Sequence, residues 1–323
     1  MSTGSVLGPG AEFDQVRGIL ARLGKQAKHV GDDCALVRIG RTTLAASVDA
    51  SLEGVHFRTD WLSFEEIGWR AAAGALSDLA AAGAKPIGVL VSLGIPGVGG
   101  KGPGARDDPA VEIMAGVAAA AHSVAAKVLG GDLVKSERYL VDVSVLGTVG
   151  RPVRRSGARP GDGLWVTGTV GGAGLALQQF RSGAYPTGAL RARFARPEPR
   201  IKAGRWLAQR GVRAMIDVSD GLAQDASHIA AASGVAIELD LDRVPSWPGV
   251  GAEAAAASGE EYELLAALPQ RFDERAAAAF GRATGLSLTR IGRCARTGTP
   301  GVRVLRGGSL VPTPRGFDHF AAP

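Results

Sequence analysis

The sequence is poor in cysteine and has no long apolar run. Its two cysteines, Cys34 and Cys294, are far apart and lack CxxC spacing. This usage argues against a disulfide framework and a cysteine-bound zinc ion, and it fits a reducing cytoplasm. The start of the chain has neither the basic nor the apolar region of a signal peptide. Because glycine or charge interrupts the apolar runs before bilayer length, we expect a cytoplasmic protein without a membrane segment.

Aromatic residues are also scarce, at 5% of the chain, whereas glycine occurs 47 times. The helices should therefore pack closely through small side chains. The hydrophobic fraction of 46% can form an ordinary core, and 323 residues suffice for two domains. The segment 152–163 is rich in arginine, proline and glycine and is typical of a junction. We therefore expect one domain over 1–150 and another over 151–323.

The chain is basic, with a formal net charge of +6 and a pI near 9.7. Charge alone would permit nucleic acid, but no basic run is interleaved with aromatic residues. Anionic small molecules fit the charge equally well. We expect small anions as ligands and no nucleic-acid partner.

Hydrophobic periodicity and turn residues predict mixed helices and strands in the first half. The predicted helices cover 12–23, 64–84 and 111–127, and the predicted strands cover 34–39, 43–49, 87–95, 128–132 and 139–149. Ser63 and Glu66 form a capping box at the start of the second helix. The strand over 87–95 is apolar enough to be buried. The glycine-rich stretch 96–109 is either a lid over a ligand or a linker.

The second half mixes helices and strands irregularly, which predicts an α+β fold. The predicted helices cover 173–180, 199–210, 222–232 and 272–283, and the predicted strands cover 164–167, 236–241, 286–291 and 302–305. Ser219 or Asp220 is placed to cap the helix at 222, although the same helix N-terminus could hold a phosphate. The turn GTVGGAG at 168–174 is only a weak match to a dinucleotide-binding loop.

Carboxylates recur at the edges of these elements. Asp49, Glu53 and His56 lie at and just past the end of the strand over 43–49. Isolated aspartates stand at similar edges, namely Asp32, Asp33, Asp78, Asp132, Asp217 and Asp220. A single aspartate is usually a cap or a turn residue, so the argument rests on the set. The set predicts that the fold brings acids together around hard cations and phosphates.

Asp78 stands out because the helical segment around it, GWRAAAGALSDLAAAGA, is almost all small residues. Such a carboxylate either lies on an exposed stripe or needs a partner in the core. The alanines leave little polar surface, so we favour a functional Asp78.

Nine segments, in this order along the chain, resemble the thiamine-monophosphate kinase family. They are GDDCALV (31–37), SVDASLEGVHF (47–57), LSDLAAAGAKP (76–86), GGD (130–132), RSGARPGD (155–162), RPEPR (196–200), IDVSDGL (216–222), SGEEYELL (258–265) and GFDHF (316–320). Each segment alone is weak, whereas the ordered series spans nearly the whole chain. The family shares a superfamily with aminoimidazole-ribonucleotide synthetase and selenophosphate synthetase.

The resemblance implies a fold and a reaction. The implied fold has an N-terminal sheet that forms a barrel across a homodimer and an α+β C-terminal domain, with the site in the cleft between them. The implied reaction is in-line transfer of the γ-phosphoryl group of ATP to thiamine monophosphate, which gives thiamine diphosphate. Both substrates are anions, so several Mg²⁺ ions held by carboxylates would neutralise and align them. The acceptor phosphate is already deprotonated, so no general base is assigned.

The resemblance also implies residue roles. The implied Mg²⁺ ligands are Asp32, Ser47, Asp49, Asp78, Asp132, Asp217 and Asp220. The implied ATP contacts are Gly131, Asp132, Arg155 and Ser219, and the implied thiamine contacts are His56, Glu260 and Phe317. Alternatives remain for two of these residues. His56 could be a loop histidine bonded to the backbone, and Phe317 could anchor the end of the chain.

The sequence departs from the family pattern mainly on the nucleotide side. Val48 and Ala50 replace usual threonines, Leu133 follows GGD where threonine is common, and Met114 stands where a tyrosine often lies against adenine. SGEEYE also replaces the usual GGEDYE. Two other functions therefore stay open: another ATP-using enzyme of the superfamily, or a nucleotide-binding protein that has lost turnover.

Overall fold

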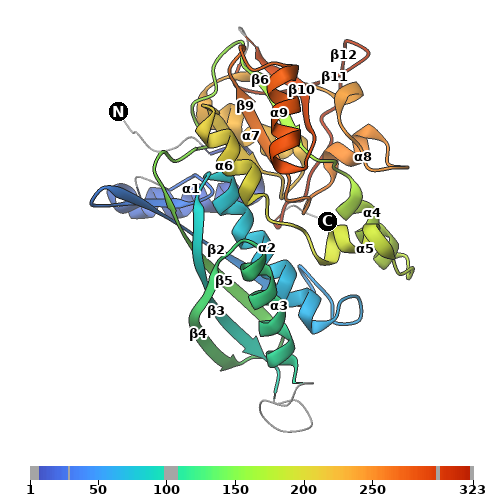
Figure 1. The fold of residues 1–323 in the computed structure, drawn as a ribbon. Helices are drawn as coiled ribbons and strands as arrows, with labels where there is room; N and C mark the ends of the chain where they lie inside the picture. Colours follow the sequence, from blue (N-terminus) through green and yellow to red (C-terminus); the bar gives the residue numbers. More distant parts are fainter. Residues whose placement is uncertain (1–6, 28–29, 98–107, 296–298, 321–323) are drawn as a thin grey trace.

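The computed structural model describes residues 7–27, 30–97, 108–295 and 299–320. Within these ranges the chain forms two sheets with flanking helices, one below the other in Figure 1. The first sheet is built from strands within 35–149 and the second from strands within 163–311. The expected α+β fold class is confirmed.

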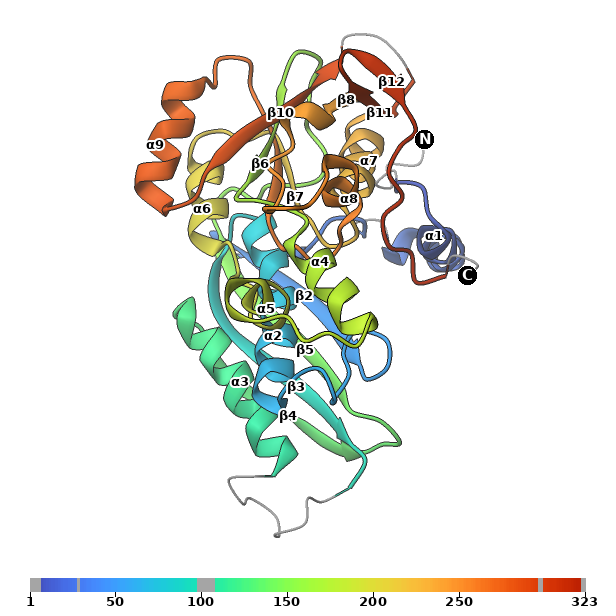
Figure 2. The ribbon, with the colours of Figure 1, turned by 90° about the vertical axis from the view of Figure 1, so that its right-hand side faces the viewer.

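The first sheet has the strand order β1-β2-β5-β3-β4, and its pairs are antiparallel except β3–β4. Helices α2 and α3 pack together on one face, and the opposite face is left open (Figure 1 and Figure 2). The elements are β1 (Ala35–Ile39), β2 (Thr42–Leu52), α2 (Phe64–Ala81), β3 (Lys85–Ile95), α3 (Pro109–Ser123), β4 (Lys127–Lys135) and β5 (Leu140–Val149). The capping box of Ser63 and Glu66 starts α2 as expected.

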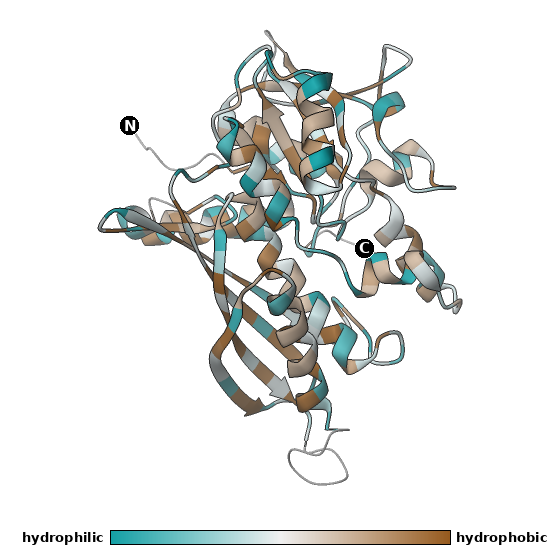
Figure 3. Ribbon diagram, in the orientation of Figure 1, coloured by the Kyte–Doolittle hydropathy of each residue, from teal (hydrophilic) through white to brown (hydrophobic). Residues whose placement is uncertain are grey.

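The two faces of this sheet differ in exposure. Val143 of β5 and Val91 of β3 point toward the helices and are buried, whereas Val48 is 62% exposed and Leu90 is 38% exposed on the open face. Hydrophobic residues are frequent along these strands (Figure 3). The expectation of a buried strand over 87–95 is wrong for one face, because helices cover only the other.

Strand β2 is longer than expected. It pairs with β5 continuously from Thr43 opposite Val149 to Leu52 opposite Leu140. Asp49 therefore lies inside a strand and not near its end. A sheet position fixes the direction of its side chain, because successive residues of a strand point to opposite faces.

The second sheet has the order β12-β11-β8-β10-β6-β9-β7 and is covered on both faces. Trp165 and Met215 face the core that α2, α6 and α9 share, whereas Leu164 and Ile216 face α7 and α8. The elements are β6 (Gly163–Thr167), α4 (Gly172–Arg181), α5 (Gly188–Ala195), α6 (Ile201–Gln209), β7 (Ala214–Asp217), α7 (Leu222–Ser233), β8 (Ala236–Asp240), α8 (Ala252–Ala257), β9 (Leu264–Leu268), α9 (Glu274–Thr284), β10 (Leu288–Ala295), β11 (Gly301–Arg306) and β12 (Ser309–Val311). The elements α5, β7, α8, β9 and β12 were not predicted, because a short segment shows little periodicity.

The first helix, α1 (Ala11–Leu23), lies against the end of the chain. The backbone N–H of Ala11 donates to the Asp318 carboxylate at 2.6 Å. A negative charge is favourable at a helix N-terminus, so the Asp318 carboxylate stabilises α1. The contact also holds the C-terminal segment against the N-terminal helix.

Helix α7 begins differently from the expectation. Neither Ser219 nor Asp220 caps it with a side chain. Instead, the Asp225 carboxylate accepts from the backbone N–H groups of Gly221 and Asp220, at 3.1 and 3.3 Å. The expected cap is therefore wrong, since a carboxylate from the first turn satisfies these donors.

The glycine-rich stretch 96–109 lies mostly outside the described residues. Among the described helices, none is both long enough and apolar enough to cross a membrane.

Helices α2 and α3 cross at a point where glycine is required. A Cβ at Gly68 would lie 1.8 Å from the Ile113 carbonyl oxygen, and one at Gly116 would lie 1.9 Å from the Glu65 carbonyl oxygen. The backbones of the two helices therefore approach as closely as hydrogen side chains allow. This confirms the expected packing through small residues.

The crossing yields a stability prediction. Gly68→Ala should lower the free energy of unfolding by about 1–3 kcal/mol, because the added methyl forces the helices apart. Gly18→Ala is the matched control, since Gly18 is also helical but a Cβ added there would have no neighbouring atom within 4 Å. That variant should be more stable by up to about 1 kcal/mol. Urea unfolding would measure both, and equal effects of the two substitutions would contradict the crossing argument.

Candidate functional site

A large cleft of about 1400 Å³ opens between the two sheets. It is bounded by the residues before β1, strand β2, helix α2, the loop after β7, the loop before β9 and the end of the chain. Most of the expected site residues line it, namely Asp32, Asp49, His56, Asp78, Arg155, Asp217, Ser219, Asp220, Glu260 and Phe317. The tertiary structure thus brings residues from both halves of the chain to one place.

Three carboxylates form the centre of this cleft. Asp33, Asp78 and Asp217 each offer an oxygen, and these oxygens lie within 4.8 Å of one another. They come from the turn before β1, from α2 and from the end of β7. Ser47 supports the group, because its Oγ donates to the Asp78 Oδ2 at 2.5 Å. Asp49 lies two residues after Ser47 on the same face of β2.

The electrostatics of this centre favour a bound cation. Burial, together with the Asp33 charge, raises the pKa of Asp217 to about 7. Burial and the Asp217 charge also raise the pKa of Asp78 well above its usual value. Burial and the charge of Glu260 raise the pKa of Asp49. Carboxylates that repel one another in a desolvated cleft are stabilised in the charged form by divalent ions.

Asp33 was missed as a site residue, whereas Asp32 was expected. Asp32 accepts from the Arg154 guanidinium at 2.6 Å and from the Arg155 backbone N–H at 3.0 Å. Asp33 accepts from the Arg155 guanidinium at 2.7 and 3.1 Å. The Gly–Asp–Asp turn is visible in the sequence, but only the tertiary structure decides which aspartate points to Asp78.

Gly131 and Asp132 lie away from this centre within one chain. They belong to β4, at the edge of the sheet. Asp132 pairs with Ser92 of β3, which pairs with Asp142 of β5, which in turn pairs with Ala50 of β2. Residues opposite one another in a sheet share a face, so Asp132 lies on the open face. Asp49 points to the helix-covered face, where it lies near Gly74 of α2.

The loop before β9 is strained and faces the cleft. Glu260 and Tyr262 have φ of 58° and 50°, in the left-handed region that non-glycine residues rarely adopt. The Glu260 carboxylate forms an ion pair with Arg70 of α2. Strained backbone of this kind clusters at functional sites. Arg70 was missed, although an arginine in an alanine-rich helix is as unusual as Asp78.

The other glutamates of this segment, Glu261 and Glu263, stabilise the strained backbone. Glu261 and Glu263 point inward, where Arg193 binds both carboxylates at 3.0 Å. The Glu261 carboxylate also accepts from the N–H groups of Gly171 and Ala173, at 2.7 and 3.0 Å. The anion at the GTVGGAG turn is therefore a carboxylate of the protein itself. This agrees with the weak match of that turn to a dinucleotide-binding loop.

The end of the chain forms another wall of the cleft. Phe317 is anchored by its backbone, since its N–H donates to the Asp220 carbonyl at 2.8 Å, but its ring stays 46% exposed. His56 accepts a hydrogen bond at Nδ1 from the Leu52 N–H at 3.1 Å, which leaves Nε2 for another contact. Burial and nearby His319 lower the pKa of His56, so its imidazole is neutral.

Comparison with known proteins identifies the family. Models for the N-terminal and C-terminal domains of AIR synthase related protein match residues 31–149 and 159–304. Thiamine-monophosphate kinase of Salmonella typhimurium is 35% identical over 96% of both chains. The Escherichia coli protein of the same name is 34% identical over 96% of both. This chain belongs to the thiamine-monophosphate kinase family.

Solved structures agree with this membership. The structure described as AaThiL complexed with AMPPCP and TMP matches with a TM-score of 0.82 at 30% identity, over 96% of this chain and 97% of that one. The hydrogenase maturation protein HypE matches with a TM-score of 0.71 at 19% identity, over 90% of this chain and 92% of that one, which shows the shared fold alone.

The departures from the kinase family pattern lie mostly outside the carboxylate centre. The Val48 and Leu133 side chains are exposed. Ala50 lies opposite Asp142 on the open face of the sheet, and Met114 packs on α3 against the core. Within one chain, the residues at these four positions do not belong to the group of Asp33, Asp78 and Asp217.

The raised pKa of Asp217 yields a prediction for the metal-free kinase. The pKa is 3.8 when unperturbed and about 7 in the folded protein, so the folded state keeps a proton that the unfolded state loses in between. The contribution of this group to the free energy of unfolding therefore falls as pH rises from about 4 to about 7. In chelator at pH 8, Asp217→Asn should be more stable than the wild type by at least about 1 kcal/mol. Near pH 4 the two should be alike.

Urea unfolding at the two pH values measures this difference. Excess Mg²⁺ at pH 8 should reverse the order of stability, because only the wild-type carboxylate gains an ionic partner. An Asn variant that is less stable than the wild type in chelator at pH 8 would contradict the repulsion argument.

Proposed function

We propose that this protein transfers the γ-phosphoryl group of ATP to thiamine monophosphate and so makes thiamine diphosphate. The observation that carries the proposal is the buried group of Asp33, Asp78 and Asp217 in a cleft with arginine and aromatic side chains. Relatives that match 96% of the chain are named for this activity. The matching structure described as complexed with AMPPCP and TMP supports the same pair of substrates.

The carboxylates would hold Mg²⁺, which neutralises the repelling phosphates when bound. Asp33, Asp49, Asp78 and Asp217 fit this group by their oxygen donors, their burial and their raised pKa values. Asp32 and Asp220, at the edge of the group, would take further ions, and Ser47 orients Asp78 through its hydrogen bond. No proton has to be removed from an acceptor phosphate at neutral pH, so the chain needs no general base.

Other residues would orient the two substrates. Arg155 lies beside Asp33 and, with Ser219, would contact the phosphates of ATP once metal binds the carboxylates. His56, Glu260 and the exposed ring of Phe317 would contact the thiamine moiety. Glu260 is held for this by Arg70 and by the strained loop around it.

A kinase assay with thiamine monophosphate, ATP and Mg²⁺ tests the proposal. The wild type should form thiamine diphosphate, and Asp78→Asn and Asp33→Asn should each lower turnover at least about a hundredfold, equivalent to about 2.7 kcal/mol. Asp242→Asn, at an exposed position in the short 3-10 helix Leu241–Arg243 after β8, should retain full activity.

The outcomes separate the three candidate functions. ATP consumption without thiamine diphosphate would point to another enzyme of the superfamily. ATP binding without turnover would point to a nucleotide-binding protein. Near-normal activity in Asp78→Asn would remove the proposed metal centre.

The proposal includes a homodimer whose two first sheets close into one barrel. The open face of the sheet carries Val48, Ile87 and Leu90 with exposed fractions between 38% and 62%. Apolar sheet faces and free edges of this kind are usually covered, and a twofold copy is the commonest cover. The position of Asp132 on this face would allow it and Gly131 to contact ATP and Mg²⁺ of the partner's cleft.

Mixed dimers test this arrangement. Co-expression of Asp132→Ala with Asp78→Asn should restore up to about half of the wild-type activity, because one of the two sites then combines an intact Asp78 with an intact Asp132 across the interface. Each variant alone should be inactive. The measurement is the turnover of purified, differently tagged heterodimers.

Two results would count against the arrangement. Inactive heterodimers would show that Asp132 does not act across an interface. A stable monomer at micromolar concentration in sedimentation would rule out the dimer itself.

The proposal also includes two domains, over 1–150 and 151–323, and a cytoplasmic location. The two free, buried cysteines fit that compartment.

A further inference from the structure

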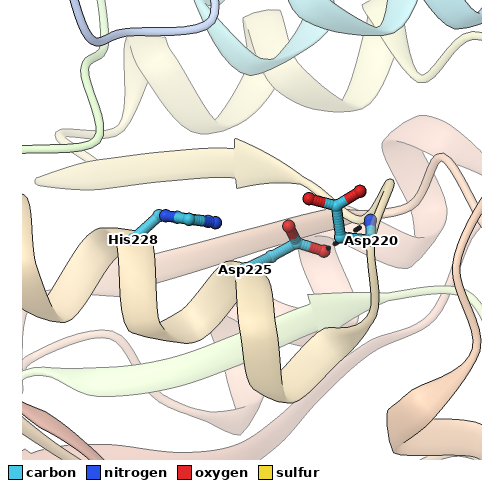
Figure 4. A group of neighbouring side chains, drawn as sticks. All are labelled: Asp220, Asp225 and His228. Carbon is cyan, nitrogen blue, oxygen red and sulfur yellow. Dashed lines mark hydrogen bonds between the residues drawn. The ribbon is translucent and has the colours of Figure 1, made fainter. Parts of the chain in front are cut away.

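A second group of possible metal ligands lies behind the wall of the cleft. Asp220, Asp225 and His228 each offer one ligand atom, and these atoms lie within 4.8 Å of one another. Figure 4 shows the three side chains on the same side of α7 and the turn that precedes it. Asp225 and His228 are three residues apart in the helix, which places both on one face.

His228 has no hydrogen-bond partner within the described residues. Its side chain is 2% exposed, and neither Nδ1 nor Nε2 makes a hydrogen bond. Buried imidazoles normally bond through at least one nitrogen. The imidazole nitrogen lies too far from the Asp220 and Asp225 carboxylate oxygens for a hydrogen bond. The three ligand atoms are nevertheless close enough that small side-chain rotations would let all of them bind one ion.

The N-terminal segment closes this place off from water. The Phe13 ring of α1 lies against the imidazole with centroids 4.2 Å apart. Gly8 lies directly over it, since a Cβ at that position would be 2.2 Å from Nδ1. The site is thus enclosed by α7, the turn at Asp220 and the start of the chain.

The carboxylates keep free oxygens for a ligand. Within the part of the chain that the structure describes, Asp225 accepts through Oδ2 from the backbone N–H groups at the start of α7, and its Oδ1 remains available. Asp220 lines the main cleft and stands between the two metal groups. A neutral imidazole has one nitrogen with a free lone pair, which can bind a metal ion, and neither nitrogen of His228 is engaged within the described residues.

We infer that Asp220, Asp225 and His228 bind a divalent transition-metal ion such as Zn²⁺ or Mn²⁺. One imidazole nitrogen with two carboxylates is a donor set that such ions take, whereas Mg²⁺ prefers oxygen ligands and water. The ion would join α7 to the turn that carries Ser219 and Asp220. This inference does not depend on the identity of the phosphorylated substrate.

Calorimetric titration of the full chain with Zn²⁺ tests the site. The protein is first stripped with chelator and then kept in excess Mg²⁺, without nucleotide, so that the carboxylate centre is occupied. The wild type should bind one Zn²⁺, and His228→Gln should weaken that binding at least about tenfold. His319→Gln is the matched control, because His319 and His56, with ring centroids 5.0 Å apart, form a pair of imidazoles elsewhere in the described residues.

The result in each variant decides the inference. Weaker binding in His228→Gln with unchanged binding in His319→Gln supports it. Equal Zn²⁺ affinity in the wild type and a folded His228→Gln, or the absence of Zn²⁺ binding by the wild type, overturns it.

Diffraction from wild-type crystals grown with Zn²⁺ provides a test that needs no variant. Anomalous scattering at the zinc absorption edge should show a peak between the three side chains. If His228→Gln does not fold, this map decides alone, and a map without a peak there overturns the inference. Because neither experiment uses thiamine monophosphate or ATP, their failure is distinguishable from failure of the proposed kinase activity.

Discussion

The repulsion among carboxylates buried around α2 is the constraint on which the rest of the structure depends. Asp33, Asp78 and Asp217 come from three elements and meet in a desolvated cleft. They can approach because the second half of α2 is rich in alanine and glycine, which lets strands and helices lie close to it. Arg155 balances only part of the charge, so burial and the remaining repulsion together raise the pKa values of these groups. A site that is unfavourable when empty is well suited to divalent ions.

A second network fixes the wall of the cleft formed by the loop before β9, at the cost of backbone strain. Glu261 and Glu263 are buried on Arg193 and Arg200, and their anchoring forces Glu260 and Tyr262 into left-handed conformations. The neighbours of each anchor therefore point into the cleft. The same alternation would place a thiamine contact at Glu260 with little freedom to move, which lowers the entropy lost on binding.

In the proposed dimer, the open face of the first sheet would link assembly to catalysis. Within one chain Asp132 lies across the sheet from Asp49 and on the opposite face. A sequence pattern can relate both residues to phosphate chemistry, but it contains no information on which copy of the chain supplies each one. The strand pairing is what separates them, and it makes the dimer a requirement of the proposed mechanism.

The sequence by itself determined the α+β class, the capping box at Ser63, most helices and strands and most residues of the cleft, because local periodicity and ordered motifs depend on neighbours along the chain. Only the tertiary structure decided the rest. It chose Asp33 beside Asp78, replaced the expected cap of α7 by Asp225 and gave Glu260 its partner Arg70. Each of these is a contact between a side chain and a group whose direction depends on the fold of a distant segment or on the turn of a helix. Periodicity and motif spacing carry no signal for such directions.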